Sequence, residues 1–117
     1  MKRIAIPVTN ERLSEYFGKC HHYEIFEVEG KSIKQPEAVF PRGKTVLELP
    51  DWLEEQGITG IISFKVSSEI ISLFASRKVN LFIGVPRESP QKLVDAWMEG
   101  KLESDENIIH EITNNAF

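Results

Sequence analysis

Runs of apolar residues alternate along the chain with stretches in which apolar and polar positions follow a helical period. A short run that is apolar at every position is typical of a strand buried on both faces, whereas helical spacing is typical of a helix that covers a sheet. The pattern therefore predicts a layered α/β domain. Strands are predicted at residues 4–8, 23–28, 33–40, 58–64 and 79–83.

Local start and stop signals place three helices between and after these strands. A serine cap or a proline in the first turn favours a helix start, and a glycine favours a helix end. Residues 45–49 could also be helical, in which case Pro50 would kink the helix. The expected start and stop residues are Pro50 and Gly57, then Ser67 or Ser68, then Ser89 with Pro90 and finally Gly100.

The order of these elements predicts a mixed sheet with helices on both faces. Residues 29–31 form a tight turn, so the second and third strands make an antiparallel hairpin. Pro36 lies in the third strand and cannot donate a backbone hydrogen bond, which places that strand at an edge of the sheet. The two later strands follow helical crossovers, so they should run parallel to the first strand.

Composition bounds this picture. The chain has 117 residues, of which 41% are hydrophobic, and this suffices for one compact domain, assigned to residues 1–103, with a polar tail at 104–117. A formal charge of −4 disfavours nucleic acid as a partner.

No run of apolar residues approaches the ~18 residues that span a membrane, so we expect no membrane partner and a soluble, cytoplasmic protein. A single cysteine fits a reducing compartment.

The only cysteine and two of the three histidines stand together as Cys20, His21 and His22. Thiolate and imidazole are ligands for zinc, copper, iron and iron–sulfur species, so this cluster is the candidate metal site. In an extended segment Cys20 and His22 would point to one side and His21 to the other. Two ligands do not close a zinc site, but they could take an open position on a preformed cluster or complete a site shared by two subunits. The alternative is a small buried cysteine beside two solvated histidines.

Other candidate residues lie in the same loop or directly after a later strand. Tyr16 and Phe17, next to Gly18, either form an aromatic lip facing a ligand or plug the end of the core, and the plug is the more common arrangement. Lys65 follows a parallel strand, at the edge where open α/β sheets bind ligands. Its charge would suit an anionic cluster or an organic acid, although a solvated surface lysine is the more common case.

The sequence does not favour an enzyme. Residues 4–8 and 58–64 carry no carboxylate with which a sheet could hold two catalytic metal ions. Glu24 and Glu27 are three residues apart in a predicted strand, where successive side chains alternate between faces, so they cannot lie on the same face. No phosphate-binding loop or nucleophile elbow is recognisable. A different class of function is an interaction module, in which the edge strand 79–83 or the tail pairs with a partner protein or with a second copy in a homodimer.

The order of several segments resembles one known family. The opening strand 2–8, the loop 14–20 and the strand 23–30 look like the start of the dinitrogenase iron-molybdenum cofactor biosynthesis family, the NifX-like domains also found at the carboxyl end of NifB. The resemblance continues through residues 49–63 and 94–102 in the same order and spacing. It covers roughly residues 2–102.

The resemblance implies a ribonuclease H-like motif with three α/β/α layers and a five-strand mixed sheet of order 3-2-1-4-5, the second strand being antiparallel. It also implies that the protein binds or carries iron-molybdenum cofactor or an iron–sulfur precursor without turning it over. The implied partners are proteins that donate or accept the metallocluster.

The resemblance carries a set of site residues onto this chain, with two departures. Ser14, Phe17 and Gly18 match the family's Ser-x-His-Phe-Gly loop, but Tyr16 stands where the family commonly has a histidine. The glycines usual after the fourth strand are replaced by residues 64–66. The chain is thus similar to a divergent member, with or without a bound cluster. Cys20 matches a cysteine in a subset of relatives, His21 and His22 offer imidazoles nearby, and His110 matches a histidine in the tail of some relatives.

Overall fold

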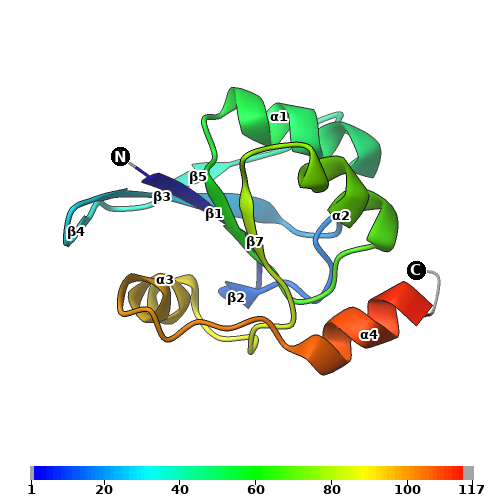
Figure 1. The fold of residues 1–117 in the computed structure, drawn as a ribbon. Coiled ribbons are helices and arrows are strands. Elements are labelled where there is room, and N and C mark those ends of the chain that lie inside the picture. The colour runs from blue at the N-terminus through cyan, green and yellow to red at the C-terminus, as the bar shows by residue number, and fades with distance from the viewer. Residues whose placement is uncertain (1, 115–117) are drawn as a thin grey trace.

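The computed structural model describes residues 2–114 and has three layers. A mixed sheet lies between α1 and α2 on one face and α3 on the other (Figure 1). Its main path runs β4-β3-β1-β6-β7. This order confirms the expected α/β architecture, with an antiparallel second strand and two later parallel strands. The principal strands are β1 (Lys2–Thr9), β3 (His22–Glu29), β6 (Gly60–Ile62) and β7 (Asn80–Phe82).

The strand β1 is central because five consecutive residues, 4–8, are buried on both faces. It pairs antiparallel with β3 over residues 2–8, with Ile4 opposite Phe26 and Pro7 opposite Tyr23. On its other side it runs parallel to β6. A continuous run of apolar residues predicts an inner strand that is buried on both faces, and β1 agrees with this prediction.

The predicted third strand is divided in two. β4 (Ser32–Ile33) and β5 (Glu37–Val39) both pair with β3, and the break between them contains Pro36, which has no N–H to donate. A further strand, β2 (Arg12–Leu13), pairs with the end of β1 through a turn at residues 10 and 11. Two residues are too few to show a period, so the sequence pattern did not predict β2.

The helices begin where the capping signals place them. α2 (Ser68–Ala75) is capped by Ser67, and α3 (Pro90–Met98) by Ser89, each through a side-chain oxygen that accepts a backbone N–H bond. A 3₁₀ turn, η1 (Val46–Glu48), leads directly into α1 (Leu49–Glu55). Pro50 therefore lies in the first turn of α1, where it causes no kink.

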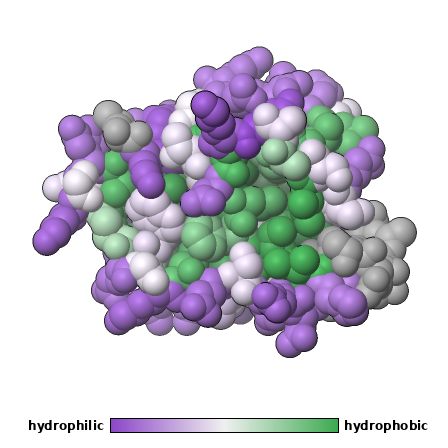
Figure 2. Space-filling view, in the orientation of Figure 1, coloured by the Kyte–Doolittle hydropathy of each residue, from purple (hydrophilic) through white to green (hydrophobic). Residues whose placement is uncertain are grey.

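Each face of the sheet carries its own apolar cluster. The first lies under α1 and α2 and includes Tyr23, Leu53 and Phe74, and the second lies under α3 and includes Phe26 and Leu93. Figure 2, in the orientation of Figure 1, shows apolar side chains gathered around the middle of the view, where β7 forms an edge of the sheet.

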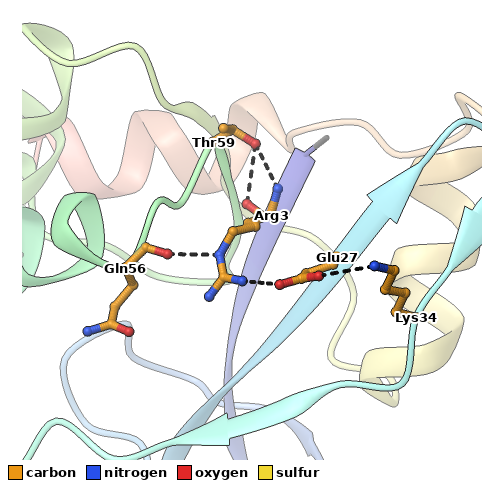
Figure 3. Close-up of polar contacts among 5 residues, drawn as sticks. All are labelled: Arg3, Glu27, Lys34, Gln56 and Thr59. Carbon is orange, nitrogen blue, oxygen red and sulfur yellow. Dashed lines mark hydrogen bonds and ion pairs between the residues drawn. The ribbon is translucent and has the colours of Figure 1, made fainter.

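Arg3, near the start of β1, contacts β3, the end of α1 and the residue that precedes β6 (Figure 3). Its Nε donates to the carbonyl of Gln56 at 2.8 Å, and its backbone N–H donates to Oγ1 of Thr59 at 3.1 Å. Its guanidinium pairs with Glu27 on β3, which also lies 3.7 Å from the ammonium group of Lys34. These contacts hold the end of α1 and the start of β6 against β1.

A fourth helix, α4 (Glu106–Asn114), forms in the segment predicted to be a polar tail. The N–H of Asp105 donates to the carbonyl of Ile83 at 2.8 Å, and the half-buried Ile108 and Ile109 pack against the cluster under α1 and α2. Residues 115–117 of the tail lie outside the described residues. Within the part of the chain that the structure describes, no helix is long and apolar enough to cross a bilayer.

Candidate functional site

Two loops meet where β1 and β6 end, at the carboxyl edge of the parallel strands. The N–H of Phe17 donates to the carbonyl of Lys65 at 2.9 Å, and the N–H of Lys65 donates to the carbonyl of Glu15 at 3.0 Å. Tyr16 and Lys65 form a parallel bridge. This edge is where open α/β sheets commonly bind ligands, and the contacts bring the predicted Lys65 beside the predicted aromatic loop.

A pocket of about 320 Å³ lies between these loops and the start of α2. Its volume is at the lower end of the range for small-ligand sites. It contains four of the five residues predicted to contact a cofactor. Ser14, the fifth, is not among the lining residues, because its buried hydroxyl lies 2.6 Å from that of Thr9. The pocket is lined by Tyr16, Phe17, Gly18, Lys19, Val46, Lys65, Ser67 and Ile70.

The pocket places two cations around the ring of Tyr16. Nζ of Lys19 lies 5.6 Å from the ring centre of Tyr16, and Nζ of Lys65 lies 5.8 Å from it. The Lys65 side chain is only 17% exposed, and Glu15 Oε2 lies 3.9 Å from its ammonium group. Two ammonium groups therefore lie around the Tyr16 ring, and their positive charge attracts an anionic ligand.

Phe17 and Gly18 build the inner wall of the pocket. Phe17 is 2% exposed, its ring packs edge to face on Tyr23 and Phe74, and its carbonyl accepts a 2.7 Å hydrogen bond from the Tyr23 hydroxyl. Phe17 therefore plugs the end of the core and does not form a lip, in agreement with the more common of the two expected arrangements. At Gly18 a Cβ atom would lie 2.7 Å from Cγ2 of Val46, so glycine permits this close approach.

Cys20 lies apart from the histidines, and the expectation that it shares a side with His22 is wrong. Cys20 packs against the cluster that contains Tyr23, whereas His22 contacts Glu24, on the opposite face of β3 from Tyr23. The reason is local: β3 begins at His22, so Cys20 precedes the regular alternation. Burial raises the pKa of the Cys20 thiol from 9.0 to about 11, although a hydrogen bond with Tyr23 opposes the shift. A thiol with this pKa is protonated at neutral pH and is a poor ligand.

This shift predicts a pH dependence of stability. Unfolded Cys20 ionises near pH 9 and folded Cys20 near pH 11, so in this window the folded state retains a proton that the unfolded state has lost. The stabilisation is complete below pH 9 and falls as the pH rises through 11. In urea unfolding between pH 8 and 11, the wild-type protein should lose more stability than a Cys20→Ala variant. Parallel pH profiles of the two proteins would contradict the raised pKa.

The structure brings the two histidines together. His21 Nδ1 lies 2.9 Å from His22 Nδ1, and His22 Nε2 lies 3.2 Å from Glu24 Oε2. The ring of Phe40 has its centre 5.7 Å from the centre of each imidazole. His110 is exposed on α4. Among the described residues, no three His, Cys, Asp or Glu side chains are grouped as metal ligands, so the predicted trio of residues 20–22 does not form one site.

Sequence reasoning missed three residues that this geometry makes relevant. Lys19 adjoins Gly18, and its charge within a candidate ligand loop was a usable signal. Val46 reaches the pocket from η1 only through tertiary packing, which no local pattern shows. Glu24 lies two residues after His22, and in a strand this spacing places both side chains on one face, which was also a usable signal.

Residues 1–100 match the family described as dinitrogenase iron-molybdenum cofactor. An uncharacterised protein of Methanocaldococcus jannaschii is 25% identical over 111 residues, covering 91% of this chain and 93% of that protein. The fold is similar to that of the solved structure of PH0822, with a TM-score of 0.82 and 23% identity over 92% of this chain and 97% of the other. It is also similar to a crystal structure from Methanocaldococcus jannaschii described as a dinitrogenase candidate, with a TM-score of 0.72 and 18% identity over 88% and 93% of the two chains.

The match to the family spans nearly the whole domain, from β1 to the end of α3, and contains both loops of the pocket. The solved structures share the fold. The chain belongs to the dinitrogenase iron-molybdenum cofactor family.

Proposed function

We propose that the pocket at the carboxyl edge of β1 and β6 binds an anionic metallocluster, either iron-molybdenum cofactor or an iron–sulfur precursor, as cargo. Membership of the family points to a role in the biosynthesis or binding of this cofactor. The observation that supports the pocket as the binding site is the placement of Lys19 and Lys65 around the ring of Tyr16. Metal–sulfur clusters with thiolate or carboxylate ligands carry negative charge, which two ammonium groups complement.

The donor set of the pocket fits a cargo that is held without strong metal coordination. The residues described as lining it contribute two ammonium groups and the hydroxyls of Tyr16 and Ser67, but neither a thiol nor an imidazole. The Ser67 hydroxyl already accepts the N–H of Ile70 at 3.3 Å. Charge and contact with the aromatic ring would therefore provide the attraction. A cluster held in this way retains its own ligands and can be released to an acceptor.

We further propose that the protein is a carrier and not an enzyme, and that its partners are the proteins that supply and receive the cluster. β1 and β6 carry no carboxylate that could hold catalytic metal ions. The buried wall formed by Phe17 and Ile70 also offers no group able to transfer protons. Binding, orientation and release are the steps that these side chains can perform.

A charge-reversal experiment tests this proposal. The Lys65→Glu variant should bind a synthetic, anionic molybdenum–iron–sulfur cluster at least about tenfold more weakly than the wild-type protein, a loss of about 1.4 kcal/mol, because an attraction becomes a repulsion. Lys65→Met retains most of the apolar stem that lies over Tyr16 and should give an intermediate loss. Binding is measured anaerobically by optical titration, and the wild-type affinity should fall as salt is added.

Lys101→Glu is the matched control, because it makes the same change in net charge at a side chain that is 75% exposed and paired with Glu99. It should bind the cluster like the wild-type protein. Equal losses in Lys101→Glu and Lys65→Glu would show that only overall charge matters. No wild-type binding at any salt concentration would overturn the proposal and favour a metal-independent interaction module.

A further inference from the structure

Two imidazoles lie in contact at the start of β3, outside the pocket. We propose that His21 and His22 chelate one divalent transition-metal ion of the Cu²⁺ or Ni²⁺ class through their Nδ1 atoms. Cys20 takes no part in this site, which is independent of the cluster pocket. Success or failure at one site therefore leaves the other unaffected.

The separation of the two nitrogens selects the class of metal. The Nδ1 atoms are 2.9 Å apart, and the two rings are nearly perpendicular, at 89°. Two imidazole nitrogens that are each about 2.0–2.1 Å from a metal lie about 2.9 Å apart when the angle at the metal is 90°, and about 3.3–3.4 Å apart when it is tetrahedral. The observed separation fits adjacent positions of a square-planar or octahedral ion, the geometry of Cu²⁺ and Ni²⁺, better than tetrahedral Zn²⁺.

Glu24 sets the tautomer that the site requires. A carboxylate only accepts hydrogen bonds, so the 3.2 Å contact makes His22 Nε2 a donor and leaves a lone pair on Nδ1 of the neutral ring. Without metal, His21 Nδ1–H donates to that lone pair. On binding, the His21 proton moves from Nδ1 to Nε2, both Nδ1 atoms face the metal, and each ring remains neutral. A carboxylate behind a metal-bound histidine is a common supporting arrangement.

The surroundings hold both histidines in place before a metal arrives. The N–H of His21 donates to the carbonyl of Val8 at 3.0 Å, and His22 pairs with Val8 in the sheet. The ring of Phe40 lies against both imidazoles, and the guanidinium of Arg42 lies 5.5 Å from the centre of that ring. Among the described residues no third protein ligand joins the pair, so water or a donor from another molecule would fill the remaining positions.

Titration calorimetry with Ni²⁺ on the purified protein tests this site. We expect one Ni²⁺ per chain, a loss of at least about tenfold in affinity in His21→Ala and in His22→Ala, and a loss of about tenfold or more in Glu24→Gln, the range found for supporting carboxylates. Cys20→Ser and His110→Ala, which remove the remaining thiol and the remaining histidine, should bind Ni²⁺ like the wild-type protein. Thermal melts confirm that each variant is folded.

A spectroscopic measurement makes the test independent of affinity. The electron paramagnetic resonance spectrum of the Cu²⁺ complex should show two imidazole nitrogens in the wild-type protein and one in His21→Ala. A single nitrogen in the wild-type complex, unchanged affinity in His21→Ala, or an equal loss in His110→Ala would overturn the proposal. The last result would identify adventitious binding to any surface histidine.

Discussion

Replacement of Phe17 by alanine is expected to lower the free energy of unfolding by about 3–5 kcal/mol, the usual range for a buried phenylalanine. Phe17 is 2% exposed and its ring packs between Tyr23 and Phe74, with ring centres 5.7 and 5.8 Å away. Truncation would leave a cavity where the loop of the pocket joins the core. It would also loosen the backbone carbonyl of residue 17, which accepts a hydrogen bond from the Tyr23 hydroxyl.

Chemical denaturation measures this loss, and Phe40→Ala is the matched control. Phe40 is 42% exposed, so its truncation should cost about 1 kcal/mol or less. A loss in Phe17→Ala no larger than that in Phe40→Ala would mean that Phe17 is a mobile lip of the pocket. In that case the interpretation of Phe17 as a plug of the core would be wrong.

Gly84→Ala is expected to cost about 2–5 kcal/mol, the second largest effect. Gly84 has φ +77, a region in which a Cβ atom costs about 1–2 kcal/mol. The added Cβ would also lie 2.7 Å from that of Asp105 and 2.9 Å from that of Ile108, and such crowding costs about 1–3 kcal/mol. Because Asp105 directly precedes α4 and Ile108 lies in its first turn, the variant should displace this helix from the body of the domain.

Gly100→Ala separates backbone strain from crowding. Gly100 has φ +71, but nothing lies within 4 Å of a Cβ placed there, so only the strain of about 1–2 kcal/mol applies. Hydrogen exchange should show faster opening of α4 in Gly84→Ala than in Gly100→Ala. Equal stability losses and equal exchange in the two variants would mean that α4 does not pack against Gly84.

The sequence indicated those parts of the fold that depend on local patterns. The apolar run in β1 and the serine caps of α2 and α3 each act within a few residues, and each led to the element observed. Pro36 indicated the edge of the sheet, but the strand predicted around it is divided into β4 and β5. α4 was missed although a local signal was present, since the carboxylate of Asp105 accepts the N–H of Asn107 at 2.8 Å at the start of this helix. Its helix is docked by Ile108 and Ile109 together with a backbone bond to Ile83, all of which are tertiary contacts.

The candidate site was predictable only in part, because a register error of one residue reverses the face of a strand. The alternation expected of an extended segment does not reach Cys20, because β3 begins at His22; Cys20 is half-buried and packs against the core, and the two histidines meet. Lys65 was predicted at the carboxyl edge of the parallel strands, and the structure adds that Tyr16 bridges to it there. Their contact with Lys19 and Val46 depends on loop conformation, which no sequence period encodes.

The location of the cluster is tested most directly by nuclear magnetic resonance of the ¹⁵N-labelled protein, titrated anaerobically with the synthetic molybdenum–iron–sulfur cluster. Amide signals of residues 16–19 and 65–70 should shift or broaden as the cluster is added, and those of residues 20–24 should change little. Changes centred on residues 20–24, or none at residues 16–19 and 65–70, would contradict binding in this pocket.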